Sequence, residues 1–75
     1  MYILAQDKRT LINFNNFHEI FLDDENLRIV GRVFGNEKNL TVILGVYDDL
    51  ETAKKEFKRF EDYLLDNEVL IHAFC

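Results

Sequence analysis

The side chains that could act as nucleophiles, bases or metal ligands are few in this chain. It contains two histidines, His18 and His72, one cysteine, Cys75, and no serine. Covalent catalysis needs a nucleophile beside a base, and a zinc site needs several His and Cys ligands at suitable spacings. The two histidines stand far apart in the sequence, and no Cys-x-x-Cys motif includes Cys75. We therefore expect a protein that is not an enzyme, with no metal site and no cofactor.

The three glycines do not indicate a nucleotide-hydrolysing site. Gly31, Gly35 and Gly45 do not form the pattern of a phosphate-binding loop, and no Lys-Ser or Lys-Thr pair follows them. Gly31 lies inside an apolar run, where a strand glycine marks a bulge or the close approach of another part of the chain. We interpret Gly31 as a packing position rather than as a ligand contact.

The chain is acidic. Nine Lys and Arg residues against fourteen Asp and Glu residues give a net charge of -5. This charge disfavours direct binding of nucleic acid and favours a protein partner with a basic surface. An acidic turn and a helix N-cap would also explain the densest acidic stretches. The residues in these stretches that we predict to bind the partner are Asp23, Asp24, Glu25, Asp48 and Asp49.

Composition predicts one soluble domain over residues 1–75. Apolar residues make up 48% of the chain, which is enough for one core, and a single cysteine cannot form an internal disulfide. The sequence shows no charged leader followed by an apolar segment, and no apolar run near the roughly 18 residues that a membrane span needs. The expected location is the cytoplasm.

Short apolar runs separated by turn-forming residues predict strands. The turn-forming residues include 35–39, and the runs are rich in β-branched and aromatic side chains. From Leu50 the apolar residues recur at steps of three and four, which predicts a helix of about 17 residues capped by Asp48 or Asp49. The five predicted strands cover residues 1–5, 11–14, 17–22, 27–34 and 40–47, and a sixth covers residues 69–75.

The expected fold class is α+β, with the element order βββββαβ. Short loops favour antiparallel neighbours, so we expect a curved antiparallel sheet of about five strands, one amphipathic helix packed on it and a C-terminal strand. Glu56 falls among the charged residues that we expect on the solvent-facing side of the helix. The expected core consists of Ile3, Leu11, Ile20, Ile29, Val33, Ile43, Leu50, Phe57, Phe60, Leu64 and Ile71.

Aromatic residues exceed what one helix on one sheet can bury. The chain has seven Phe and three Tyr residues, residues 17–22 are apolar on both faces of their strand, and the apolar run 69–74 contains neither Pro nor Lys. A monomer would leave this surface exposed. We therefore expect a homodimer or a larger homo-oligomer, and the predicted interface residues are Phe17, Phe21, Ile71 and Phe74.

Basic residues allow an alternative function. Arg28 and Arg32 share one face of their strand, and Lys54 and Lys58 lie on the solvent-facing side of the helix. Together with a second chain, such residues would clamp the phosphates of a nucleotide second messenger. The alternative is therefore a sponge that sequesters a small ligand, with Arg28, Arg32, Lys54 and Lys58 as its ligand-binding residues.

Several short motifs together resemble a family. They are Met1-Tyr2-Ile3 with Gln6-Asp7-Lys8, then Leu11-Ile12-Asn13, Leu44-Gly45-Val46-Tyr47 and Glu51-Thr52-Ala53. With these motifs the chain resembles small uncharacterised proteins of phages, prophages and Gram-positive bacteria that carry a Leu-Gly-x-Tyr pattern before a helix.

The proteins that the chain resembles carry no assigned catalytic residues. Phage proteins of this size often inhibit host defence, as anti-CRISPR proteins do. The resemblance thus implies a phage-encoded inhibitor of a bacterial defence complex or nuclease that acts by stoichiometric protein–protein binding in the host cytoplasm. A nucleotide sponge and a small structural or regulatory bacterial protein are the alternatives.

Overall fold

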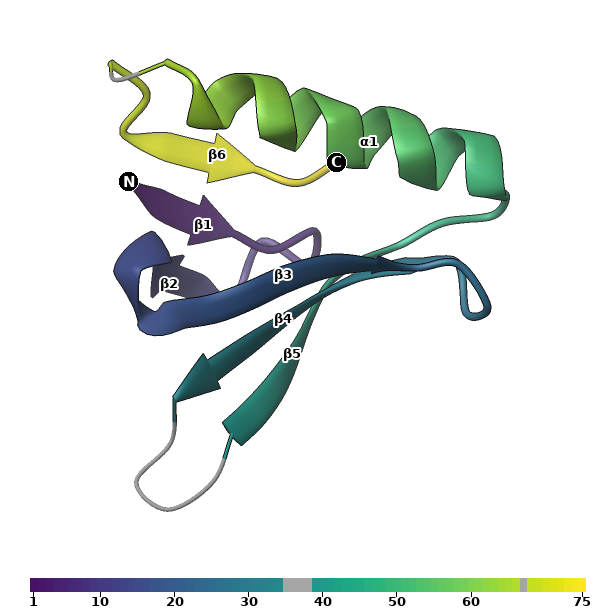
Figure 1. Ribbon diagram of the computed structural model, residues 1–75, viewed down its shortest axis with the longest axis horizontal. Coiled ribbons are helices and arrows are strands. Elements are labelled where there is room, and N and C mark those ends of the chain that lie inside the picture. Colours follow the sequence, from purple (N-terminus) through teal and green to yellow (C-terminus); the bar gives the residue numbers. More distant parts are fainter. Residues whose placement is uncertain (35–38, 67) are drawn as a thin grey trace.

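The computed structural model describes residues 1–34, 39–66 and 68–75, so most of the turn expected at residues 35–39 lies outside the described residues. The described part of the chain forms six strands, one α-helix and one short 3-10 helix (Figure 1). This order of strands and helix is the predicted one, and the fold class is α+β. The elements are β1 (Tyr2–Leu4), β2 (Leu11–Asn13), η1 (Phe14–Asn16), β3 (Phe17–Asp23), β4 (Arg28–Phe34), β5 (Asn39–Val46), α1 (Leu50–Leu64) and β6 (Ile71–Ala73).

The strands form two sheets instead of the single five-stranded sheet expected, and that expectation is wrong. Sheet A has the order β2-β1-β6, with β1 antiparallel to β2 and parallel to β6. Sheet B has the order β3-β4-β5 and is antiparallel throughout. The 3-10 helix η1 separates the two sheets, because it turns the chain between β2 and β3 where a hairpin would have paired them. Its first turn is stabilised by Asn13, whose Oδ1 accepts a hydrogen bond from the Asn15 N–H at 3.0 Å.

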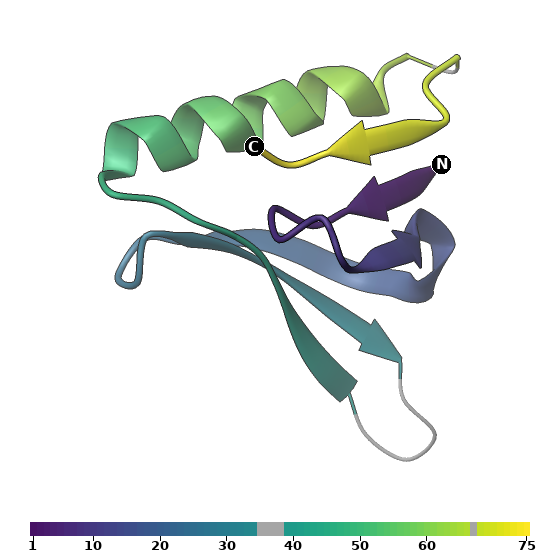
Figure 2. The same ribbon diagram turned by 180° about the vertical axis from the view of Figure 1, so that it is seen from behind.

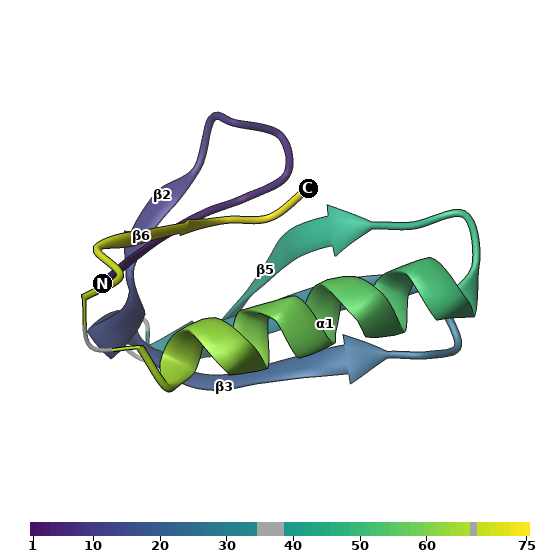
Figure 3. The same cartoon turned by 90° about the horizontal axis from the view of Figure 1, so that it is seen from above.

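Helix α1 connects the end of sheet B to the last strand of sheet A. Asp49 caps it, because its Oδ1 accepts a hydrogen bond from the Thr52 N–H at 2.8 Å. The helix lies beside β6 (Figures 1 and 2) and runs along β3 (Figure 3). Because α1 carries the chain back along the molecule after β5, β6 can run parallel to β1. A short hairpin loop joins only antiparallel strands.

The core lies between the two sheets and the helix. The expected core residues Ile3, Ile29 and Phe60 are buried, but Ile43 is 46% exposed and Ile71 is 55% exposed. Leu11 and Leu64 are also exposed, at 55% and 41%. The buried cluster consists of Ile3, Ala5, Ile29, Leu44, Tyr47, Ala53, Phe60 and Phe74.

A bulge in β5 explains why Ile43 is exposed although it was expected in the core. Ile29 pairs with Gly45, whereas the next residue of β4, Val30, pairs with Ile43, so Leu44 is an extra residue in its strand. The bulge turns Leu44 into the core, where it is 1% exposed, and leaves Ile43 on the other face. Strict alternation along the sequence cannot reveal such a shift.

Gly31 is a packing position, in agreement with the interpretation from the sequence. A Cβ atom at this residue would lie 2.8 Å from Cδ1 of Phe17, whose ring packs over Gly31 on the core face of sheet B. The ring occupies the space that any side chain at residue 31 would need.

We predict that Gly31→Ala destabilises the protein by about 1–3 kcal/mol, because the added methyl group forces the Phe17 ring out of its position. Urea unfolding would measure the loss. In a Phe17→Leu background, Gly31→Ala should lower the free energy of unfolding by less, because the smaller side chain leaves room for the added methyl group. If Gly31→Ala lowers the free energy of unfolding equally in the wild type and in the Phe17→Leu variant, the Phe17 ring is not what excludes a side chain at residue 31.

Candidate functional site

The fold brings the predicted acidic residues to one end of the molecule. Asp23 is the last residue of β3, and Asp24 and Glu25 lie in the turn that follows. This turn lies at the same end as the start of α1, next to Asp48 and Asp49 (Figures 1 and 3). A backbone hydrogen bond joins the two segments, from the Tyr47 N–H to the Leu27 carbonyl at 2.8 Å. We call these five residues the acidic end.

Two of the five carboxylates also have structural roles. Hydrogen bonds from Asn26 and from Arg28 hold the pKa of Asp23 below its usual value, and the Thr52 N–H does the same for the pKa of Asp49. Asp24, Glu25 and Asp48 are exposed. These three therefore form the part of the acidic end that is free to meet a partner.

The structure does not bring the predicted ligand-binding residues together. Arg28 and Arg32 lie on the face of sheet B opposite the core, since their neighbour Ile29 points into the core beneath α1. Arg28 pairs with Asp23 at 2.9 Å, and Arg32 lies 3.6 Å from Glu19 and over the Phe21 ring. Lys54 and Lys58 belong to the helix on the other side of the sheet. One chain therefore offers no phosphate clamp from these four residues.

The predicted interface residues are likewise dispersed. Phe17 packs toward the core, whereas Phe21 lies on the opposite face of sheet B beneath Arg32. Phe74 is fully buried, so it stabilises the core and does not reach a partner. Ile71 is 55% exposed on the outer face of sheet A, in register with Tyr2. Self-association stays a prediction, and of the four predicted residues Phe74 is buried in the core whereas Ile71 is exposed.

A buried polar cluster fastens the helix to the last strand. The Glu56 carboxylate, expected to face solvent, is instead buried and accepts hydrogen bonds from Arg59 Nε at 3.1 Å, from Arg59 Nη2 and from the Cys75 N–H at 3.2 Å. Arg59 Nη2 also donates to the Ala73 carbonyl at 2.6 Å. Burial would raise the pKa of Glu56, but the hydrogen bonds from Arg59 and Cys75 leave it below its usual value.

His72 lies next to this cluster without joining it. It is fully buried, and neither of its ring nitrogens has a hydrogen-bond partner in the described part of the chain. Its ring packs against Phe60, Tyr63 and Phe74, with centroid distances of 5.1, 4.8 and 4.7 Å. Burial, assisted by the charge of Arg59, lowers the pKa of His72 to about 4. The imidazole is therefore neutral at pH 7 and acts as an apolar ring.

A polar cleft of about 340 Å³ lies beside the cluster. Gln6 in its wall replaces a strand neighbour for β5: its N–H donates to the Leu44 carbonyl at 2.7 Å, and its Oε1 accepts from the Val46 N–H at 2.8 Å. Its Nε2 donates to the carbonyls of Val46 and Cys75 at 3.1 and 3.0 Å. These bonds hold the fold together, and we assign the cleft no chemistry.

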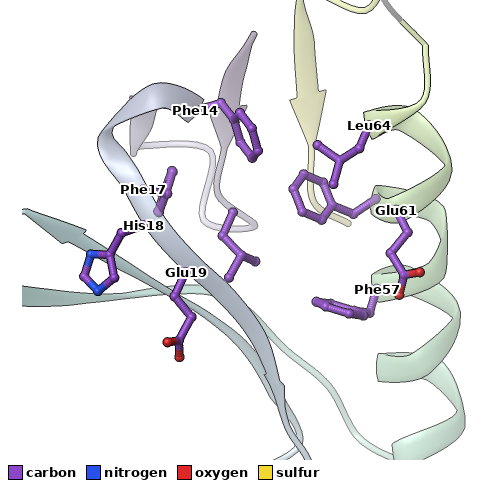
Figure 4. Close-up of a pocket in the computed structure, with 9 residues that line it drawn as sticks. Phe14, Phe17, His18, Glu19, Phe57, Glu61 and Leu64 are labelled. Carbon is purple, nitrogen blue, oxygen red and sulfur yellow. The ribbon is translucent and has the colours of Figure 1, made fainter.

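An apolar groove of about 210 Å³ lies between β3 and α1 (Figure 4). Phe14 points into it from η1, and Phe57 and Leu64 point into it from the helix, whereas the His18 ring points away. The groove is lined by Phe14, Phe17, His18, Glu19, Ile20, Phe57, Phe60, Glu61 and Leu64.

Neither the groove nor the polar cluster was predicted from the sequence. Most residues of the groove have the spacing of core positions, and the only signal for an exposed apolar surface was the excess of aromatic residues. For the cluster, the signal was a Glu and an Arg three residues apart on the helix, which also fits an ordinary surface pair. The partners of this pair, Ala73 and Cys75, depend on how β6 folds back.

Comparisons with known proteins return no match from protein-family models, from curated proteins or from solved structures. Over residues 1–34, 39–66 and 68–75, no group of three or more His, Cys, Asp or Glu side chains could hold a metal ion. In the same residues, no helix has both the length and the apolar character needed to cross a membrane.

We predict that the free energy of unfolding falls as the pH drops from about 6.5 toward 4. The pKa of His72 is about 4 in the folded protein against 6.5 for a free side chain. The unfolded chain therefore binds more protons in this window, and the loss reaches about 3 kcal/mol. Below this window, protonation of Glu56 removes further stability. Urea unfolding at a series of pH values would measure the slope.

His72→Leu should flatten this slope between pH 4 and 6.5, because it removes the group that takes up the proton. The control is Ile71→Leu at the neighbouring residue, which is 55% exposed and carries no titratable group, so the slope should stay as it is in the wild type. If His72→Leu and the wild type lose stability in parallel, His72 is not the group responsible.

Proposed function

We propose that this protein is a non-enzymatic binding module that acts by stoichiometric protein–protein contact, with the acidic end placed against a basic surface of its partner. The observation that carries the proposal is the gathering of acidic residues from two separate segments at one end. The Tyr47 N–H and the Leu27 carbonyl tie these segments together at 2.8 Å.

The acidic end is suited to electrostatic recognition. Its exposed members, Asp24, Glu25 and Asp48, are acidic residues on short turns between regular elements. Complementary charge accelerates association and orients the two proteins. Proteins that handle nucleic acid present basic surfaces to phosphate, so we propose a nuclease of a bacterial defence complex as the partner. In this reading the protein is an anti-CRISPR-type inhibitor that works in the host cytoplasm.

The nucleotide sponge has less support. Arg28 is already paired with Asp23, and Arg32 lies beside Glu19 and over the Phe21 ring. Lys58 is paired with Asp62 at 2.9 Å on the far side of the sheet. A sponge would need a second chain to complete a phosphate site, and a small structural or regulatory role has no observation of its own in its favour.

We predict that Glu25→Lys weakens inhibition of such a nuclease by about tenfold, because it places a positive charge at the contact with a basic surface. The measurement is DNA cleavage by a panel of purified CRISPR nucleases, titrated with the protein at two ionic strengths. Glu68→Lys is the matched control, since it makes the same charge change at an exposed position beyond the opposite end of α1.

The control variant should inhibit as the wild type does, and raised ionic strength should weaken the wild type more than Glu25→Lys. If Glu25→Lys and Glu68→Lys weaken inhibition equally, only the net charge matters and the acidic end is not the contact. Full cleavage by every nuclease at a molar excess of the wild type would refute the proposed class of partner.

A further inference from the structure

The groove beside β3 has one wall made of an edge strand. β3 is the outer strand of sheet B, and it makes ladder hydrogen bonds with β4 alone. The Phe17 N–H bonds to the Phe14 carbonyl, but the described residues give no backbone hydrogen bond from residues 18–23 to any segment other than β4. Alternate residues of an edge strand direct their N–H and C=O groups outward. β3 therefore offers a row of unpaired backbone groups along the groove.

Two other edges of the fold are occupied by the protein's own side chains. At the end of β5, the Gln6 side chain binds both backbone groups of Val46, and the Gln6 backbone N–H binds the Leu44 carbonyl. At β6, Arg59 binds the Ala73 carbonyl. The edge of β3 has no such side-chain cap in the described part of the chain, and an apolar groove lies against it.

We propose that this groove binds an extended segment of a partner protein, which pairs with β3 as a fourth strand of sheet B. Strand addition satisfies the free backbone groups, and alternate side chains of the segment enter the pocket between strand and helix. Cavities of about 150 Å³ accommodate benzene, so the groove of about 210 Å³ has room for one large apolar side chain of the segment.

The charge around the groove selects the chemistry of this segment. Among the described residues that line it, Glu19 and Glu61 carry charge, and both are acidic. The Glu19 carboxylate lies 3.6 Å from Arg32 and points away from the helix, so Glu19 flanks the groove whereas Glu61 borders it on the helix side. Both side chains of the Glu19–Arg32 pair are nearly half exposed, so this pair is weak. A segment with Lys or Arg on either side of its apolar residue complements the two glutamates.

The same charges disfavour a second copy of this chain as the occupant. If two β3 strands paired across a two-fold axis at the middle of the strand, Glu19 of each copy would lie close to the axis and therefore close to its counterpart. Like charges at close range oppose association. The groove also lies toward the end of α1 away from the acidic end, so this inference and the proposed function depend on different residues and fail separately.

The test uses three labelled peptides and fluorescence anisotropy. The first is the alternating peptide Lys-Val-Lys-Leu-Lys-Val-Lys. The second has the same sequence with alternate backbone nitrogens methylated, so that it cannot pair as a strand, and the third replaces every Lys by Glu. The first peptide should bind the wild-type protein, and the other two should bind at least about tenfold more weakly.

Leu64→Lys and Leu65→Lys form a matched pair of variants. Leu64 lines the groove, whereas the adjacent Leu65 is 86% exposed and lies outside it. Both variants change the net charge equally, but only Leu64→Lys should weaken binding of the first peptide by about tenfold. Glu61→Lys keeps the apolar wall and should shift preference from the basic toward the acidic peptide. Thermal melts check that each variant is folded.

Three results would overturn the proposal. Equal binding of the methylated and unmethylated peptides excludes strand addition. If Leu64→Lys and Leu65→Lys weaken binding of the first peptide equally, the groove is excluded as the binding site. The third is a dimer, seen by light scattering of the wild type, that Leu64→Lys converts to a monomer, because a second copy then occupies the groove. The proposal is supported if Leu64→Lys weakens binding of the first peptide, Leu65→Lys does not, and the methylated peptide binds the wild type more weakly than the first peptide.

Discussion

The ion pair between the buried Glu56 and Arg59, whose side chain is 33% exposed, holds the last strand of this protein against its helix. Arg59 bonds at once to the Glu56 carboxylate and to the Ala73 carbonyl, while Glu56 accepts the Cys75 N–H. Such pairs often add little net stability, but loss of Arg59 would leave the Glu56 carboxylate, which is 11% exposed, without its charged partner. Each strand of sheet A has three residues, so the docking of β6 depends on this pair and on the apolar packing of Phe74 and His72.

Hydrogen bonds from within the protein also decide which strand edges are open. Gln6 closes the end of β5, and Arg59 covers a carbonyl of β6, so side chains of the protein itself occupy these positions. β3 keeps its edge, and the helix lies beside it without filling the space between them. Under the two proposals, the open strand edge next to the apolar groove and the separate acidic end would contact proteins in two different ways.

Sequence alone predicted the order of the elements, because periodicity and turn residues are local. It did not predict the division into two sheets, since the turn at η1 and the parallel return of β6 to β1 depend on contacts between distant residues. The bulge at Leu44 reversed the faces expected for β5, and β6 placed His72 inward in place of Ile71. The acidic end was visible as sequence clusters, whereas the groove arises only when β3 and α1 come together.

Amide hydrogen exchange of the free protein tests most directly whether β3 is the open edge. We predict slow exchange at Gln6 and Val46, whose N–H groups are bonded across the fold, and fast exchange at alternate residues between Ile20 and Asp23. The fast positions should become slow when a partner segment is added. Slow exchange at every residue of β3 in the free protein, at all concentrations, would contradict the account, because it would mean that the edge is already closed.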